Sequence, residues 1–302
     1  MSAREHPIPK RDLHFDFSKV DLRRWHPGGE HVSHYWNVHS LQFPKGERFF
    51  INSVRHFRDQ VRDPVLRQQV GGFIAQEAMH GREHEAYNEA LKGIGYPVEA
   101  MERWVARTLK FALYTMPPKG RLAMTAALEH LTAIGAEDAL AHDEVLATAD
   151  PEMAQLWRWH AVEETEHKAV AFDVYREVAG TGFVAWVRRC FTMLTSSLGM
   201  TLMTWSFLVV ALRRSGKLFD LKGWGRLLWW LWGNPGGLRR QFPRYWKYFR
   251  PGFHPWQVDN YDQVLRWQAQ YGSPPLIGQC IDEPLERVSD QGPGSGSGGA
   301  RS

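Results

Sequence analysis

The segments QEAMHGREHEAYN (residues 76–88) and HAVEETEHKAVAFD (residues 160–173) decide the fold of this chain. Each contains Glu-x-x-His: Glu77 with His80, and Glu164 with His167. Residues three apart on a helix share one face, so each pair directs its two side chains the same way. In a four-helix bundle, two inward-facing pairs of this kind contribute to a dinuclear metal site.

The other two helices of such a bundle each supply one further acid. Glu47 lies 30 residues before Glu77, and Glu129 lies 35 residues before Glu164, so the same arrangement occurs twice. The competing interpretation is a bundle with charged outer faces, but three of the four acids have apolar neighbours. The predicted ligands of two metal ions are therefore Glu47, Glu77, His80, Glu129, Glu164 and His167.

Two further histidines fall on the same helix faces. His84 lies four residues after His80, and His160 lies four residues before Glu164. Each is an extra nitrogen ligand, a hydrogen-bonding group that orients a carboxylate, or simply a polar neighbour. Three nearby acids are expected to be solvated charges or salt-bridge partners: Glu83, Glu163 and Glu166.

The predicted ligand types also restrict the metal. Carboxylates with imidazoles suit iron or manganese, and the absence of thiolates disfavours a structural zinc site. We expect two metal ions, iron first, with manganese or zinc as alternatives. Cys190 and Cys280 are the only cysteines, so no disulfide framework is expected. The first residues, MSAREHPIPKRD, lack the apolar core of a secretory signal, which favours the cytoplasm.

Helical periodicity and breakers predict the domain organisation. Helices are expected over about residues 64–91, 98–114, 121–148 and 151–178, and no convincing strand pattern is present. The predicted fold class is all-α, a ferritin-like helical bundle. Its expected parts are an irregular arm packed on the core (1–43), the metal-binding bundle (44–180), an apolar helix with a basic aromatic helical region (181–285) and a flexible Gly/Ser tail (286–302).

The region after the bundle is apolar and then cationic. Residues 190–212 contain no charge over 23 positions, although seven of them are Ser or Thr. Their length suits a bilayer span, and a buried helix of a large bundle is the alternative. Between Arg188 and Arg250 there are twelve Lys or Arg against one acid, Asp220, and eight tryptophans lie between Trp186 and Trp256. This pattern predicts a membrane-surface partner at the cytoplasmic face of the inner membrane, rather than nucleic acid.

The motifs give the chain a family resemblance. With AALEH around Glu129 and ERFF at Glu47, the two Glu-x-x-His segments resemble a bacterial family of predicted metal-dependent hydrolases, over about residues 20–270. The family name implies hydrolysis. The ligand set also resembles that of ferritin-like di-iron carboxylate oxygenases, including arylamine N-oxygenases, in which an additional histidine joins the cluster. That resemblance implies His84 or His160 as the extra ligand.

Three functions are compatible with these observations. The first is a di-iron oxidase or oxygenase, which uses O₂ and an electron donor to hydroxylate, desaturate or N-oxygenate an apolar, lipid-derived substrate. The second is a dinuclear metal hydrolase of an ester or phosphate. A metal-storage or scaffold bundle ranks last, because nothing indicates a closed shell. No catalytic residue beyond the ligands is predicted, and a homodimer is compatible with the sequence.

Overall fold

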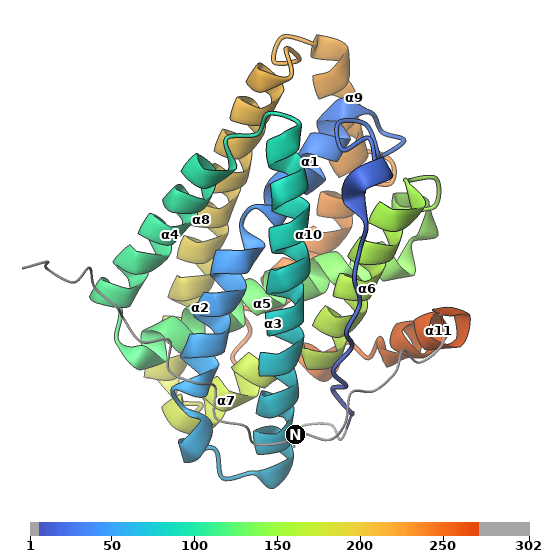
Figure 1. Cartoon of the computed structure of the whole chain (residues 1–302). Helices are drawn as coiled ribbons and strands as arrows, with labels where there is room; N and C mark the ends of the chain where they lie inside the picture. The colour runs from blue at the N-terminus through green and yellow to red at the C-terminus, as the bar shows by residue number, and fades with distance from the viewer. Residues whose placement is uncertain (1–5, 272–302) are drawn as a thin grey trace, which may run out of the picture.

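The computed structural model describes residues 6–271, and within them the regular elements are helices without strands (Figure 1). This confirms the predicted all-α class. Cys190 is a free thiol, and the predicted Gly/Ser tail and Cys280 lie outside the described residues. The α-helices are α1 (Glu30–Ser40), α2 (Phe43–Arg55), α3 (Pro64–Gly93), α4 (Val98–Thr115), α5 (Pro118–Ala141), α6 (Pro151–His167), α7 (Val170–Ala179), α8 (Phe183–Arg214), α9 (Leu221–Trp232), α10 (Gly237–Lys247) and α11 (Tyr261–Tyr271). Short 3-10 helices are η1 (Phe17–Lys19), η2 (Arg58–Gln60), η3 (Asp143–Val145) and η4 (Pro255–Gln257).

The two helices that carry Glu-x-x-His begin at strong local signals. The Asp63 carboxylate accepts a hydrogen bond from the Val65 amide at 2.9 Å, and Pro64 occupies the first turn of α3. Asp150 caps α6 in the same way, through the amide of Glu152 at 3.0 Å. A capping carboxylate satisfies amides that lack a partner within the helix, and proline there loses no hydrogen bond. These caps fix where each helix starts and hence the position of its Glu-x-x-His.

Helices α2, α3, α5 and α6 form the bundle that holds the predicted ligands. Helix α2 packs on α3 and α5, and α6 packs on α5 and α3, which closes a ring of four. Helix α8 lies against α5 and α1, α10 covers α5, and α11 covers α6 (Figure 1). The predicted ligands therefore face a shared interior.

That interior is apolar at its two ends and polar between them. On α3, Val70 and Phe73 belong to one apolar cluster, and Tyr87 and Leu91 belong to the other. The segment 77–84, with its acids and histidines, lies between them along the helix. Hydrophobic burial at both ends stabilises the bundle around groups that are costly to bury.

The N-terminal region differs in part from its prediction. Residues 30–40 form α1 instead of irregular chain. Its buried face includes His31, His34 and Asn37, so polar residues occupy core positions and hide the helical periodicity. The preceding arm does pack on the core, as expected: the Pro9 carbonyl accepts a hydrogen bond from Gln76 of α3.

Two predicted helices end earlier than expected. Helix α5 ends at Ala141 rather than near residue 148, and η3 follows it. The helix expected over 151–178 is divided into α6 and α7 at Lys168. The Lys168 ammonium is buried there and donates hydrogen bonds to the Val258 carbonyl at 2.8 Å and the Asn260 amide oxygen at 2.6 Å. These contacts to a distant part of the chain lie outside any local sequence signal.

Helix α8 contains the charge-free segment. By length and composition it is the one helix among residues 6–271 that qualifies to cross a membrane. Only 28% of its most apolar 18-residue window is buried in the molecule. The alternative of an ordinary buried core helix therefore does not describe it.

Candidate metal centre

All six predicted ligands lie in the interior of the four-helix bundle. Helix α2 contributes Glu47, α5 contributes Glu129, and α3 and α6 each contribute one Glu-x-x-His. Each of the six residues is at most 3% exposed. Charged groups are buried at this level only when a partner offsets the loss of water.

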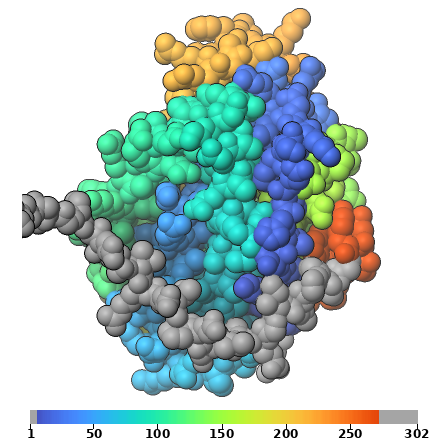
Figure 2. Space-filling model, in the orientation of Figure 1, coloured from blue at the N-terminus to red at the C-terminus, as the bar shows by residue number. Residues whose placement is uncertain are grey.

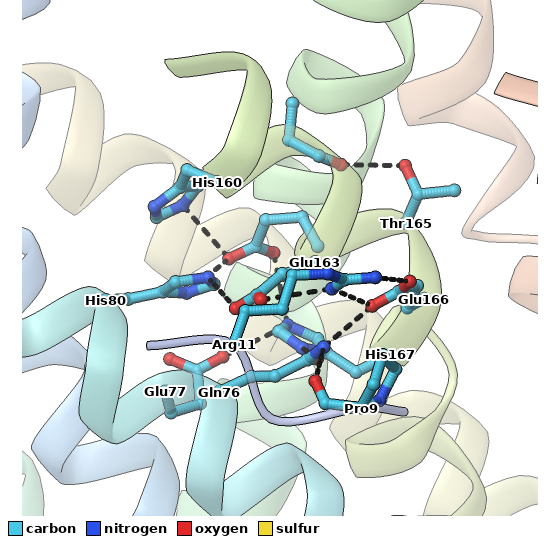
Figure 3. A network of polar contacts seen from close by, with 12 residues as sticks. Pro9, Arg11, Gln76, Glu77, His80, His160, Glu163, Thr165, Glu166 and His167 are labelled. Carbon is cyan, nitrogen blue, oxygen red and sulfur yellow. Dashed lines mark hydrogen bonds and ion pairs between the residues drawn. The ribbon is translucent and has the colours of Figure 1, made fainter. Parts of the chain in front are cut away.

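His167 lies among three of the acids. Its Nε2 is 3.1 Å from Glu77 Oε1, 3.5 Å from Glu129 Oε2 and 3.6 Å from Glu164 Oε2. Contributions from α3, α5 and α6 thus meet at one ring nitrogen. Figure 3 shows His80, Glu77 and His167 directed toward the same interior.

Four groups of three residues bring potential ligand atoms within 4.8 Å of one another. Both additional histidines take part, and His160 belongs to two of the groups. The groups are Glu77–Glu164–His167, Glu47–Glu77–His80, His80–His160–Glu164 and Glu47–His84–His160. Glu129 is outside these groups and is placed near them by its contact with His167. The arrangement has the oxygen- and nitrogen-rich character that iron, manganese and zinc accept.

A hydrogen bond to Gln76 fixes the tautomer of neutral His167. The Gln76 amide nitrogen donates to the Pro9 carbonyl at 3.0 Å and to Glu166 Oε2 at 2.7 Å, so its oxygen is the acceptor. His167 Nδ1 lies 2.8 Å from that oxygen and must carry the proton. In neutral His167, Nε2 then presents a lone pair to the acids. A lone pair and carboxylate oxygens repel each other, and a cation between them would turn that repulsion into attraction.

A longer chain of hydrogen bonds fixes His160. The Ser40 hydroxyl donates to Asn88 Oδ1 at 2.8 Å, so its oxygen accepts from His84 Nδ1 at 2.9 Å. His84 Nε2 is then the acceptor for His160 Nδ1, at 3.0 Å. In neutral His160, Nε2 is left with a lone pair 3.1 Å from Glu164 Oε1. Two acceptors again face each other.

The acids repel one another at this depth. Burial raises the pKa of Glu47 well above its usual value, and the charges of Glu77 and Glu164 raise it further. Burial together with the same two neighbours also raises the pKa of Glu129. Both shifts reflect the cost of placing several negative charges in a space without water. A bound cation would remove that cost.

The pKa values of His80 and His167 shift in opposite directions. Burial lowers the pKa of His80 well below its usual value, and His160 adds to the effect. Burial also opposes the charged form of His167, but the hydrogen bonds and charges of Glu164 and Glu77 raise its pKa well above the usual value. A proton on His167 offsets part of the negative charge that metal ions would otherwise balance.

A buried ion-pair layer lies beside the acids and histidines (Figure 3). Arg11, from the N-terminal arm, donates to Glu163 at 3.0 Å and to Glu166 at 2.7 and 2.5 Å. The other oxygen of Glu163 lies 3.0 Å from His80 Nε2. Burial raises the pKa of Glu163 to about 7, against the opposing effect of Arg11.

The sequence left two roles open for three acids near the site, solvated charges or salt-bridge partners, and the structure confirms the second. Glu83, Glu163 and Glu166 are buried salt-bridge partners, so the expectation of solvated charges is wrong. Glu83 pairs with its neighbour Arg82, whereas Glu163 and Glu166 pair with Arg11 from the distant N-terminal arm, which no local spacing reveals. Sequence reasoning also missed Gln76, Ser40, Asn88 and Thr132, because none belongs to a recognisable motif.

The residues present fit metal ions. Buried ligand atoms without any hydrogen-bond partner include both oxygens of Glu47, Glu77 and Glu129, both ring nitrogens of His80, and the Nε2 atoms of His160 and His167. Native proteins rarely leave buried polar atoms unpaired, and binding of an ion is one accepted explanation. Apart from Glu129, the residues that carry these unpaired atoms are members of the four groups.

A cavity of about 410 Å³ borders the metal centre. It lies between α1, α5, α6, α8, α9 and α10, and His160 and Thr132 form part of its wall. The Thr132 hydroxyl donates to Glu164 Oε2 at 2.5 Å. A ligand in the cavity would therefore contact residues that themselves contact the acids.

The fold and the buried acids define the class as a helical, metal-binding protein. A family model described as "Predicted metal-dependent hydrolase" matches residues 9–259. The chain belongs to this family of predicted metal-dependent hydrolases, which confirms the family resemblance. No curated protein and no solved structure shows a significant match.

Family membership corrects the first functional hypothesis. The expected di-iron oxidase or oxygenase is contradicted, and the alternative of a metal-dependent hydrolase is supported. Metal ions are supported as cofactors, whereas iron and O₂ as a co-substrate are not. The physical reason for the error is that carboxylates and imidazoles ligate redox iron and hydrolytic ions alike.

Proposed function

We propose that this protein is a dinuclear metal-dependent hydrolase. The proposed ligands are Glu47, Glu77, His80, Glu129, Glu164 and His167, with His160 as an additional nitrogen ligand. The observation that carries the proposal is the convergence of buried carboxylate and imidazole ligand atoms, many of them without a hydrogen-bond partner, in the bundle interior. Family membership supports the hydrolytic chemistry.

Divalent ions in such a site supply an electrophile for a substrate carbonyl or phosphoryl oxygen and lower the pKa of bound water. The side chains of the protein hold the proposed ligands in position. The Thr132 hydroxyl holds one oxygen of Glu164, and Gln76 holds the ring of His167. Neighbouring hydrogen bonds of this kind orient ligands and tune a metal site.

We favour an ester as the substrate class over a phosphate, because the cavity beside the acids is lined mainly by apolar residues. In the proposed reaction, the oxygen of water forms a bond to the acyl carbon. The bond between that carbon and the alcohol oxygen breaks, and the alcohol oxygen takes up a proton. The products are a carboxylic acid and an alcohol, and no electron donor is required.

The test combines metal content with anaerobic hydrolysis. We would measure metals by mass spectrometry and assay p-nitrophenyl acetate and p-nitrophenyl phosphate in an anaerobic chamber. About two ions per chain and ester hydrolysis that is independent of O₂ are expected. Glu77→Gln should lose bound metal and at least about 100-fold in rate, since neighbouring-residue changes alone cost up to that much.

Glu85 provides the matched control. It lies on the same helix but is exposed, where it contacts Arg48 at 3.2 Å. Glu85→Gln should retain both metal and rate. A metal-loaded protein that consumes O₂ and cleaves neither substrate would overturn the proposal.

A further inference from the structure

We propose that the cavity beside the metal centre binds the apolar acyl chain of the substrate. This inference deepens the proposed hydrolysis and rests on it for the position of the cleaved bond. The ligand class is a medium- or long-chain acyl ester, with its carbonyl at the His160 end and its chain against the aromatic walls.

The walls of the cavity are mainly apolar. Trp36 of α1, Ile134 of α5 and Leu238 of α10 contribute to them. Asp138 also lines the cavity, but its carboxylate is held by Arg240 at 2.6 and 3.0 Å. A small polar substrate would lose hydration against these mainly apolar walls, whereas an alkyl chain gains from burial.

His160 and Thr132 mark the end of the cavity that lies beside the metal centre. His160 Nε2 is buried without a hydrogen-bond partner, and Thr132 Oγ1 already donates to Glu164. An ester carbonyl at this end would lie next to the acids, and the chain attached to it would extend toward α9 and α10. The cavity thus separates a reacting end from a chain-binding end.

Gly135 of α5 is the position at which the cavity is most simply filled. It lines the cavity, and a Cβ atom built there meets no atom within 4 Å. A small side chain therefore fits without displacing neighbours. A large side chain would occupy the space assigned to the acyl chain.

The experiment measures binding, so it does not depend on turnover. Acetate, octanoate and dodecanoate are titrated into the metal-loaded protein by calorimetry. We expect affinity to rise with chain length, by up to about fourfold for each buried methylene. Gly135→Phe should lower dodecanoate affinity at least about tenfold, and the matched Gly135→Ala should retain it.

The outcomes separate the two proposals. Equal affinity for acetate and dodecanoate, or unchanged dodecanoate binding by Gly135→Phe, would overturn the acyl-chain site even if p-nitrophenyl acetate is hydrolysed. Chain-length-dependent binding that Gly135→Phe abolishes would support the site even if no ester is cleaved. In that second case only the proposed hydrolysis fails.

The outer face of α8 carries a separate feature. Phe191, Leu194, Leu198 and Leu202 are each at least half exposed. Their spacing places them on one side of the helix, and Val187 and Val209 continue the stripe for about 33 Å at 1.5 Å per residue. The opposite side packs on α5 and α1. An apolar stripe of this length on a soluble surface marks a binding face.

From the charges around this stripe we infer that α8 docks on an anionic lipid surface. Arg213 and Arg214 are exposed at the end of α8, and Lys222 and Arg226 are exposed on α9. The turn between these helices projects beyond the bundle, in gold at the top of Figure 2, and exposes Phe219 and Leu221. Cations beside inserted apolar groups suit anionic headgroups. A second copy of the chain would bring like charges together.

Vesicle sedimentation tests this docking. The full chain is mixed with phosphatidylcholine vesicles with or without phosphatidylglycerol. Binding should require phosphatidylglycerol and weaken as salt rises. Changing Leu194, Leu198 and Leu202 together to Gln should abolish it, whereas Leu265→Gln, on exposed α11, should not. Absence of binding, or a salt-stable dimer in ultracentrifugation that the triple variant dissociates, would overturn the inference.

Discussion

The interior of the α2–α3–α5–α6 bundle and the outer face of α8 reverse the usual distribution of residue types. Six acids and histidines are at most 3% exposed in the bundle, whereas Phe191 and Leu198 of α8 are more than half exposed. Burying charge and exposing large apolar groups both cost free energy. The comparison indicates that a binding partner offsets the cost in each region. We propose metal ions for the bundle interior and an apolar surface for the outer face of α8.

The two regions also differ in how their cations are used. Arg11 is buried and balances Glu163 and Glu166, while Arg213 is exposed at the end of α8. A buried charge that loses its partner is far more costly than an exposed one. Equivalent substitutions in the two regions should therefore have unequal effects.

The largest effect is expected from removing the buried cation. Arg11→Met should lower the free energy of unfolding by about 3 to 5 kcal/mol, because it leaves two buried carboxylates without their guanidinium. Arg213→Met should change it by less than about 1 kcal/mol, the usual range for a cation at a helix end. Urea unfolding followed by circular dichroism measures both. Equal losses would break the comparison.

Metal removal should destabilise one region and spare the other. If free metal is at about 100 times its Kd, chelation removes about 2.7 kcal/mol, or about 4 °C in Tm for a chain of 302 residues. Hydrogen exchange should then increase in α3 and α6, since the acids there repel one another without a cation. Exchange in α9 should stay unchanged, and restoring the metal should reverse the effect. An equal change in hydrogen exchange throughout the chain on chelation would indicate that the metal binds outside the bundle interior.

Local spacing predicts the acids and histidines but little of what holds them. Glu77–His80 and Glu164–His167 follow from helix geometry, because three residues always return to one face. Arg11 and Glu166 are 155 residues apart, and Ser40 and His84 are 44 apart, so their contacts depend on how whole helices pack. No sequence pattern in the N-terminal arm or in α1 predicts these contacts of Arg11 and Ser40.

The spacing of the predicted ligands also does not predict which reaction the metal site supports. Glu47 and His167 are chemically suitable for iron that activates O₂ and for ions that activate water. Membership of the hydrolase family, over residues 9–259, decides between these uses. On α8, in contrast, the charge-free sequence is compatible with a bilayer span or a buried helix, and only the fold reveals which side of the helix is exposed.

The hydrogen-bond chain behind His160 gives an intermediate effect. Ser40→Ala removes the acceptor for His84 Nδ1, so the tautomer of His84 and the lone pair of His160 are no longer fixed. We expect a loss of about 10- to 100-fold in metal affinity, measured by competition with a chelator. Ser206→Ala is the matched change on α8, where the exposed hydroxyl donates to the Leu202 carbonyl. It should leave the affinity unchanged, and an equal loss in both variants would contradict the role of Ser40.

The smallest effect is expected at two helical glycines. A Cβ on Gly81 of α3 would lie 3.3 Å from Glu47 Oε2, whereas a Cβ on Gly199 of α8 meets no atom within 4 Å. Gly199→Ala should therefore raise the free energy of unfolding by about 0.4 to 1 kcal/mol, because alanine loses less backbone freedom on folding. Gly81→Ala should gain less, because the new methyl group displaces the Glu47 carboxylate by a few tenths of an ångström. Metal affinity should fall in Gly81→Ala alone. If both variants gain stability equally and keep their metal, Glu47 is not held at the position that metal binding requires.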